Sequence, residues 1–400
     1  MRIIQVSGCQ DLRQIMQQIK VDSYGIKLMV PKALSYLLKI DNIPCITANI
    51  LKQEMLSLGA DAAVSRDALT GRCKKTDCLL MGTLSQFNRL AGKLNRQPFG
   101  LDQMGKEIQF NLNNYQRKCF SLDLNGRKLN LKKRAHIMGV VNLTTDSFSG
   151  DGLYKTQYTA SANYITDYTK KLIDEGADII DIGGESSRPG AKPVSLKEEL
   201  NRIIPVIKKL SKKIKVPISI DTYKPEVARQ AMDSGAAIIN DITGLRGPRM
   251  LKVAARYKAA VVIMHMQGNP RTMQKNPVYV SLIDEISGYF KSAVKRAEDS
   301  GIDAKKIIID PGIGFGKTLK HNLEILKKLK EFKILGKPIL IGTSRKSFIG
   351  KVLNLQPQQR IFGTVSSCII AVKNGANIVR THDVKEVKQA LKILEAVNNN

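Results

Sequence analysis

The sequence predicts an α/β protein, a (β/α)8 TIM barrel preceded by a small α/β N-terminal domain. From about residue 126, short runs rich in Ile and Val alternate with helical stretches, as in βα units that build a parallel sheet. The runs are almost continuously apolar, which is typical of strands covered on both faces. Eight runs in this part of the 400-residue chain match the size of such a barrel. A doubly wound open sheet is the structural alternative.

The predicted barrel strands follow one another at regular spacing. They are the runs at 135–143, 177–183, 217–222, 236–242, 259–266, 306–312, 338–344 and 376–384. Between them lie segments with apolar residues at helical spacing, such as SLKEELNRIIPVIKKLS (195–211) and VKEVKQALKILEAV (384–397). Several of these segments close with Gly, a common helix terminator. Residues 126–400 are therefore predicted to form the barrel domain.

Residues 1–125 have a different pattern and are predicted to form the small α/β domain, whose function the sequence does not reveal. The predicted helices cover 12–19, 31–40, 48–63 and 80–95, and the short strands cover 27–30 and 77–82. A turn at LNGRKL within residues 111–134 predicts a hairpin that connects to the barrel or plugs its bottom.

Composition narrows the class of protein. Lys and Arg number 64 against 35 Asp and Glu, a net charge of +29, but the charge is spread along the chain and Trp is absent. A generally basic proteome or a preference for anionic substrates explains this distribution better than a nucleic-acid-binding module does. No apolar run is long enough to span a membrane, and the N-terminus does not resemble a signal peptide, so a cytoplasmic protein without a membrane partner is expected. The six scattered cysteines are expected to be reduced.

Every predicted barrel strand ends in polar residues. These are Asn142, Asp181, Asp221, Asn240 with Asp241, His265, Asp310, Ser344 to Ser347, and Arg380 with His382. Any one of them could simply cap the helix that follows. Eight such ends are harder to explain by capping, and the carboxyl ends of barrel strands form the active site of this fold. The sequence therefore predicts one site.

The chemistry of that site follows from charge. Carboxylates at three strand ends, with the amide of Asn240, suit the N–H edges of a flat, nitrogen-rich ring. Arg188, Arg380, His382 and Lys346 suit phosphate or pyrophosphate. A metal held by the carboxylates is an alternative, for which loosely bound Mg²⁺ is a better candidate than zinc. DPGIGFGKT (310–318) has Pro311 where a P-loop requires Gly, which argues against a nucleoside-triphosphate site.

Eight motifs together resemble the dihydropteroate synthase family of pterin-binding enzymes. They are MGVVNLTTDSFS (138–149), DIGGESSRPGA (181–191), ISIDTYKPEVA (218–228), IINDITG (238–244), MHMQGNPRTMQ (264–274), IIIDPGIGFGKT (308–318), GTSRKSFIG (342–350) and VRTHDV (379–384). The resemblance covers about residues 126–398, in order, with one motif per strand. Residues 1–125 match no part of the core synthase.

The resemblance implies a reaction and its components. The family condenses hydroxymethyl-dihydropterin pyrophosphate with para-aminobenzoate, uses Mg²⁺, and releases dihydropteroate and pyrophosphate for folate biosynthesis. It also implies that the protein forms a homodimer and that sulfonamides inhibit it. No activated Cys or Ser–His pair is visible, in agreement with a reaction that needs no covalent enzyme intermediate.

The resemblance also assigns roles by position. Pterin contacts would be Asp181, Asp221, Asn240, Met264, Asp310, Phe315 and Lys346. Pyrophosphate contacts would be Asn142, Ser187, Arg188, Arg380 and His382, with Mg²⁺ at Asn142. Aminobenzoate contacts would be Ser187, Arg188, Pro189, Phe315, Lys346 and Ser347. The catalytic residues would be Asp221, Asp310, Lys346, Arg380 and His382.

One departure and two rival functions accompany this interpretation. Thr145 replaces the family's usual proline in the first loop, which should loosen that loop. A methyltetrahydrofolate-dependent methyltransferase would share the barrel and the pterin contacts, but it would not need the SRKS and RTH anion-binding groups. A non-catalytic pterin-binding protein is the second rival.

Overall fold

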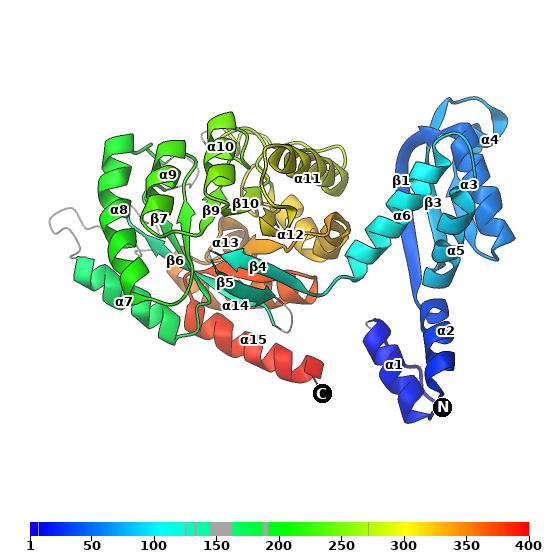
Figure 1. The fold of residues 1–400 in the computed structure, drawn as a ribbon, viewed down its shortest axis with the longest axis horizontal. Helices are drawn as coiled ribbons and strands as arrows, with labels where there is room; N and C mark the ends of the chain where they lie inside the picture. Colours follow the sequence, from blue (N-terminus) through cyan, green and yellow to red (C-terminus); the bar gives the residue numbers. More distant parts are fainter. Residues whose placement is uncertain are drawn as a thin grey trace. The chain divides into compact units, whose positions relative to one another are not determined.

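The computed structural model describes residues 1–6, 8–124, 126–131, 134–144, 162–186, 191–270 and 272–399, drawn in colour in Figure 1. The chain divides into two compact units, Met1–Asn113 and Asn114–Asn400. The sequence-based boundary at 125/126 falls inside the predicted hairpin, which the structure keeps whole within the second unit.

The first unit is a small α/β structure with a three-stranded antiparallel sheet in the order β1-β3-β2. Its strands are β1 (Ser35–Pro44), β2 (Asp61–Val64) and β3 (Lys75–Thr83). Its helices are α1 (Cys9–Gln18), α2 (Ser23–Ala33), α3 (Cys45–Ser57), α4 (Arg66–Thr70), α5 (Leu84–Leu94) and α6 (Leu101–Gln116), the last of which crosses the unit boundary. Leu51, Met55, Leu80, Phe87 and Leu90 are fully buried in its core.

Two local predictions for this unit were wrong. The segment 27–30, predicted as a strand, lies within α2, and most of the segment 31–40, predicted as a helix, belongs to β1. From Ser35 to Asp41 the burial of β1 alternates between exposed and partly buried positions, which is the period of a strand with one covered face. Pairing with β3 therefore decides the structure of this segment, over the helical propensity of its leucines.

The second unit is a closed barrel of eight parallel strands, as predicted. They are β6 (His136–Asn142), β7 (Ile179–Gly183), β8 (Ile218–Asp221), β9 (Ile238–Asp241), β10 (Ala260–Met264), β11 (Ile307–Asp310), β12 (Leu340–Gly342) and β13 (Ile378–Thr381). Their order is β11-β10-β9-β8-β7-β6-β13-β12, and a parallel bridge between Ile309 and Ile339 joins the two ends. This closure excludes the open doubly wound sheet.

Helices cover the outside of the barrel, one or more after each strand (Figure 1). They are α7 (Ala162–Asp174), α8 (Leu196–Lys213), α9 (Pro225–Asp233), α10 (Pro248–Arg256), α11 (Leu282–Asp299), α12 (Leu319–Lys328), α13 (Ser347–Leu353), α14 (Ile361–Lys373) and α15 (Val384–Asn399), with short 3-10 turns at Ala304–Lys306, Leu329–Leu335 and Pro357–Gln359. One large apolar cluster joins these helices to outward-facing strand residues such as Ile137, Ile180 and Ile309. The strands are thus buried on both faces, which explains their continuous apolar runs.

A two-stranded hairpin, β4 (Phe120–Leu124) and β5 (Arg127–Leu131), closes the bottom of the barrel, as the sequence predicted. Leu122, Leu124 and Leu131 are buried in one cluster with inward-facing residues from the beginnings of the barrel strands, including Ile179 and Ile308. The hairpin therefore seals the amino-terminal end of the barrel and leaves the opposite end for chemistry.

Within the described part of the chain, no helix is both long and apolar enough to cross a membrane. The six cysteines, which all lie among the described residues, form no disulfide bond, and the sulfur atoms of Cys45 and Cys73 lie 3.5 Å apart.

Candidate active site

The alternation of side chains along each strand determines which polar residues point into the barrel mouth. In each of four strands a buried apolar residue faces the hairpin, and a polar residue two positions later faces the same way, because strand side chains alternate between faces. The pairs are Ile179 with Asp181, Ile238 with Asn240, Ile308 with Asp310, and Ile378 with Arg380. In β8 the buried Ser219 takes the place of the apolar residue, two positions before Asp221. The structure therefore brings the predicted residues of separate motifs to one rim.

Arg380 connects the acidic side chains of that rim. Its guanidinium donates a 2.6 Å hydrogen bond from Nε to Asp181 and a 2.8 Å hydrogen bond from a terminal nitrogen to Asp221. Asn240 also donates to Asp181, at 3.2 Å. The second carboxylate oxygen of Asp181 is buried and accepts no hydrogen bond from the described residues. Such an orphaned acceptor suits an N–H donor of a bound ring.

Burial and neighbouring charges shift the pKa values of the ionisable side chains at the rim. Burial raises the pKa of Asp221 to about 7, while Arg380 opposes this shift and Asp181 adds to it. Burial also raises the pKa of Asp310, against the attraction of Lys346. For Arg380, burial alone would lower the pKa, but the carboxylates of Asp181 and Asp221 outweigh it and the net shift is upward.

Lys346 and Phe315 form the wall opposite these carboxylates. The Lys346 ammonium lies 4.5 Å from the centre of the Phe315 ring and donates to the carbonyl of Ile313. Burial lowers the pKa of Lys346 to about 8, with Asp310 opposing the shift. A cation on an aromatic face beside buried carboxylates is suited to a planar, polar ligand.

A chain of hydrogen bonds places His382 at the same rim. Its Nε2 lies 3.2 Å from the amide nitrogen of Asn142, and its Nδ1 lies 3.0 Å from the hydroxyl of Ser344. Because an amide nitrogen can only donate, Nε2 accepts and the ring proton lies on Nδ1. Ser344 reaches Asp383, which forms a bidentate ion pair with Arg345. The amide oxygen of Asn142 can coordinate a cation or accept a hydrogen bond from a water.

The other predicted residues take three kinds of position. Met264 is buried in an apolar cluster with Ile242 and Phe315, which forms a floor for a flat ring. Ser347 is exposed at the first position of α13. Ser187, Arg188 and Pro189, and also Thr145, lie outside the described residues.

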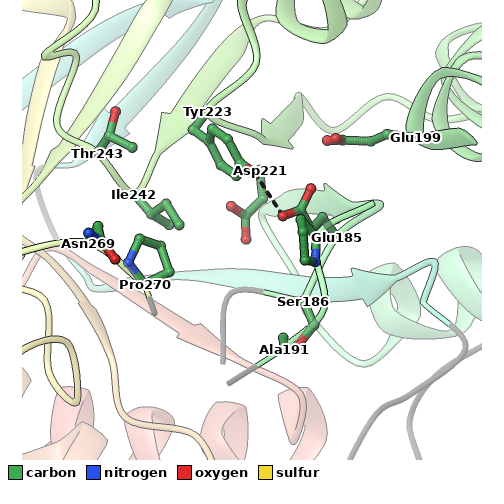
Figure 2. Close-up of a pocket in the computed structure, with 11 residues that line it drawn as sticks. Glu185, Ser186, Ala191, Glu199, Asp221, Tyr223, Ile242, Thr243, Asn269 and Pro270 are labelled. Carbon is green, nitrogen blue, oxygen red and sulfur yellow. Dashed lines mark hydrogen bonds between the residues drawn. The ribbon is translucent and has the colours of Figure 1, made fainter. Parts of the chain in front are cut away.

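A pocket of about 340 Å³ adjoins Asp221 (Figure 2). Asp221, Tyr223, Ile242 and Glu185 are among the residues that line it, and Figure 2 shows Asp221 between Tyr223 and Ser186. The Tyr223 hydroxyl donates to Glu185 at 2.9 Å, which ties the loop after β8 to the loop after β7.

Lys224, next to this pocket, joins three groups. Its ammonium donates to Glu185 at 2.5 Å, to Glu199 at 2.5 Å and to the carbonyl of Val194 at 2.6 Å. Glu185 lies near the beginning of the connection between β7 and α8, Val194 lies near its end, and Glu199 lies in α8, so one cation contacts both ends of the connection.

Sequence reasoning missed several members of this site. Lys224, Lys317 and Asp383 lie within the recognised motifs but had no assigned role, and the partners of Glu185 and Arg345 were not foreseen, because they are distant in sequence and no spacing reveals them. Conversely, Asp241 does not join the rim, because its carboxylate accepts from the backbone of Thr243 and Leu245. This is the local capping role that was weighed for such residues.

Comparison with known proteins agrees with the geometry. A model of the family described as "Pterin binding enzyme" matches residues 138–382. The chain is 46% identical over 261 residues to a dihydropteroate synthase of Escherichia coli K12, covering 65% of this chain and 91% of that protein. It is also similar to the crystal structure of Yersinia pestis dihydropteroate synthase with a sulfonamide drug, at 41% identity and a TM-score of 0.67, covering 70% of this chain and 100% of that one.

A third relative extends into the first unit. A probable bifunctional folylpolyglutamate synthase/dihydropteroate synthase of Halobacterium salinarum is 37% identical over 393 residues, which cover 98% of this chain and 46% of that protein. The first unit is thus shared with at least one relative that has a similar barrel. The family model spans the whole barrel rim, from β6 to His382. The chain therefore belongs to the pterin-binding enzyme family.

Proposed function

We propose that the chain is a dihydropteroate synthase, which condenses hydroxymethyl-dihydropterin pyrophosphate with para-aminobenzoate and releases dihydropteroate and pyrophosphate. One observation carries this proposal. Buried oxygen acceptors and an anion-binding set, Arg380, Lys346 and His382, meet at a single barrel mouth. The oxygen acceptors match the N–H edge of a pterin. The cations Arg380 and Lys346 match a diphosphate, and His382 lies beside them with its ring proton on Nδ1.

In this proposal, Asp221, Asn240 and Asp310 hold the pterin ring, Asp181 offers its unpaired oxygen, and Met264 and Phe315 cover the ring faces. Arg380 uses two of its five N–H groups on Asp181 and Asp221, and the others can reach a diphosphate. His382 and Asn142 lie on the diphosphate side of the rim. Ser347, at the start of α13, receives the aminobenzoate carboxylate.

The reaction needs no nucleophilic side chain. The bond between the pterin methylene carbon and the diphosphate oxygen breaks with both electrons leaving on the diphosphate. The carbocation is delocalised into the pterin and stabilised by the carboxylates of Asp221 and Asp310. The amine nitrogen of aminobenzoate then donates its electron pair to the carbon, and its proton passes to solvent. Arg380 and Lys346 stabilise the departing anion, and the contribution predicted for His382 would require that its ring gain a proton on Nε2.

Magnesium is a further part of this proposal. The amide oxygen of Asn142 is a hard donor at the rim, and Mg²⁺ typically takes one or two protein ligands together with phosphate oxygens and waters. Among the described residues no group of three His, Cys, Asp or Glu could hold a metal by itself, in keeping with a cation held mainly by the substrate. When bound, Mg²⁺ would neutralise charge on the diphosphate.

Two other expectations remain proposals. A homodimer is supported by exposed apolar side chains on α13 and α14, where Val352, Phe362 and Ile370 are 56%, 81% and 47% exposed. A cytoplasmic location stays a prediction from the sequence.

The test is pyrophosphate release from the full chain. Release that requires both substrates, and that a sulfonamide inhibits competitively with aminobenzoate, supports the synthase. Consumption of methyltetrahydrofolate without pyrophosphate release would support the methyltransferase instead. Tight pterin binding without turnover of either substrate would support a non-catalytic pterin-binding protein.

A further inference from the structure

The loop that follows β11 is held by side chains through four consecutive carbonyl groups, at residues 313–316. The donors are Lys346 for Ile313, Gln274 for Gly314 at 2.6 Å, Lys317 for Phe315 at 3.0 Å, and Tyr279 for Gly316 at 2.8 Å. Gln274 and Tyr279 come from the connection between β10 and α11, whereas Lys317 belongs to the loop itself. Only Lys346 has a role in the proposed reaction.

The shape of the loop explains why it needs these donors. Gly312 and Gly316 have φ of 70° and 61°, and a Cβ on either would lie 2.1 Å from the His265 carbonyl oxygen or 2.8 Å from that of Gln267. The loop is therefore pressed against the chain that follows β10. Because these glycines have positive φ, the backbone of the loop cannot pair with a neighbouring strand, and side-chain donors satisfy its carbonyl groups instead.

Lys317 is the buried centre of this support. It is 3% exposed, and besides Phe315 its ammonium contacts the Nδ1 of His265 at 2.9 Å and the carbonyl of His265 at 3.3 Å. Three acceptors around one nitrogen require its three hydrogens, so the geometry favours the charged amine. Burial lowers the pKa of Lys317 to about 7, against the attraction of Asp310. Burial also lowers the pKa of His265 to about 2, so this imidazole is neutral, and its Nδ1 accepts from Lys317 in the tautomer that carries the ring proton on Nε2.

The supported loop carries the Phe315 ring, which faces the Lys346 ammonium at 4.5 Å. We propose that Lys317, Tyr279 and Gln274 are positioning residues for the arylamine subsite, because they fix the carbonyls on and beside Phe315 and so fix its ring against Lys346. This inference rests on the proposed function for the identity of the arylamine. The pterin has further contacts at Asp221 and Asn240 that the loop does not support, so the arylamine should depend on the loop more strongly.

The experiment compares four variants of the full chain. Tyr279→Phe removes one hydroxyl, and Lys317→Met removes the ammonium and keeps most of the side-chain volume. Tyr257→Phe is the matched control, because its hydroxyl bonds Asp233 on the barrel exterior, and Lys320→Met is the control for an exposed lysine of α12. The KM for each substrate and the kcat are measured for all four.

We expect the KM for para-aminobenzoate to rise about 3- to 10-fold in Tyr279→Phe, as for loss of one hydrogen bond, and more in Lys317→Met. The KM for the pterin pyrophosphate should rise less in both, and the controls should match the parent chain. Equal increases for both substrates, or an unchanged aminobenzoate KM in Tyr279→Phe, would overturn the inference. Tyr279→Phe decides the matter if Lys317→Met does not fold.

A second readout does not depend on activity. Amide hydrogen exchange at residues 312–318 should be faster in Tyr279→Phe than in Tyr257→Phe, with the rest of the barrel unchanged. If the parent chain released no pyrophosphate, the proposed function would fail, yet this exchange would still test the support. Exchange that matched the control would overturn the inference on its own.

Discussion

Arg380, on the last barrel strand, donates a 2.8 Å hydrogen bond to Asp221, which ends a strand more than 150 residues earlier. The same guanidinium holds Asp181, so a fully buried carboxylate and a largely buried one share one cation. Such a cluster is costly to bury unless every charge has a partner. A substrate that brings both N–H donors and a diphosphate would offer new partners to both signs of charge.

Asp221→Asn should lower kcat about 100- to 1,000-fold, the usual cost of removing one preorganised electrostatic group from an active site. The reason is that the carboxylate faces the carbocation formed when the diphosphate leaves. Steady-state pyrophosphate release measures the effect, and Asp299→Asn, whose side chain is 64% exposed, is the control. If the kcat of Asp221→Asn were close to that of the parent chain, this carboxylate would have no role in the mechanism.

The pH dependence of kcat/KM for the pterin substrate should be bell-shaped. Burial raises the pKa of Asp221 to about 7, so its reactive anion is lost below that pH. Burial lowers the pKa of Lys346 to about 8, so its ammonium is lost above that pH. Because kcat/KM reports the free enzyme, the maximum should lie between these values.

The alkaline limb offers a specific check. Lys346→Arg keeps a positive charge that does not titrate in this range, so its weaker activity should no longer fall above about pH 8. An unchanged alkaline limb in Lys346→Arg would assign that limb to another group.

The same shift affects stability in a defined direction. The pKa of Asp221 rises from 3.8 to about 7 on folding, so the native state binds its proton more tightly than the unfolded chain. Its contribution to the free energy of unfolding is therefore complete below about pH 4 and is lost as the pH rises through about 7. The difference in stability between the parent chain and Asp221→Asn, measured by urea unfolding from pH 4 to 8, should follow this slope. An independence of pH would contradict the assigned shift.

Lys224→Met should destabilise the barrel by about 3–5 kcal/mol, because it leaves a buried carboxylate without its cation. The side chain of Glu199 is 1% exposed and that of Lys224 is 17% exposed, so the carboxylate has little access to solvent once the ammonium is removed. Urea unfolding of the barrel transition measures the loss, with the exposed Lys212→Met as control. Equal midpoints for the two variants would mean that the pair contributes nothing.

Leu122→Ala tests the hairpin that closes the barrel bottom. Leu122 is fully buried against the starts of the barrel strands, so truncation should cost about 2–5 kcal/mol through a cavity. Lys128→Ala on the same hairpin is exposed and should be neutral. If the hairpin contributed nothing to barrel stability, both variants would have the same free energy of unfolding as the parent chain.

The barrel was predictable because burial on both faces leaves an unmistakable pattern. Strands such as Ile238–Asp241 are apolar up to the residue that reaches the rim, and their polar ends follow from the fold. By contrast, β1 has one covered face, and its leucines favour a helix until pairing with β3 is known. Local propensity is a weak guide wherever pairing between distant segments decides.

Much of the site was not predictable. The sequence indicated that Asp181 and Arg380 belong together, but not that they form an ion pair, since 199 positions separate them. Lys317 was quoted only as part of a motif, and its role depends on three acceptors that are created by the fold of the loop.

A crystal structure of the full chain with bound hydroxymethyl-dihydropterin pyrophosphate tests the central claim most directly. The account predicts electron density for the pterin edge against Asp221, Asn240 and Asp310, and for the diphosphate beside Arg380, His382 and Asn142. Density for the pterin outside the barrel mouth, or with the diphosphate against the carboxylates, would contradict it.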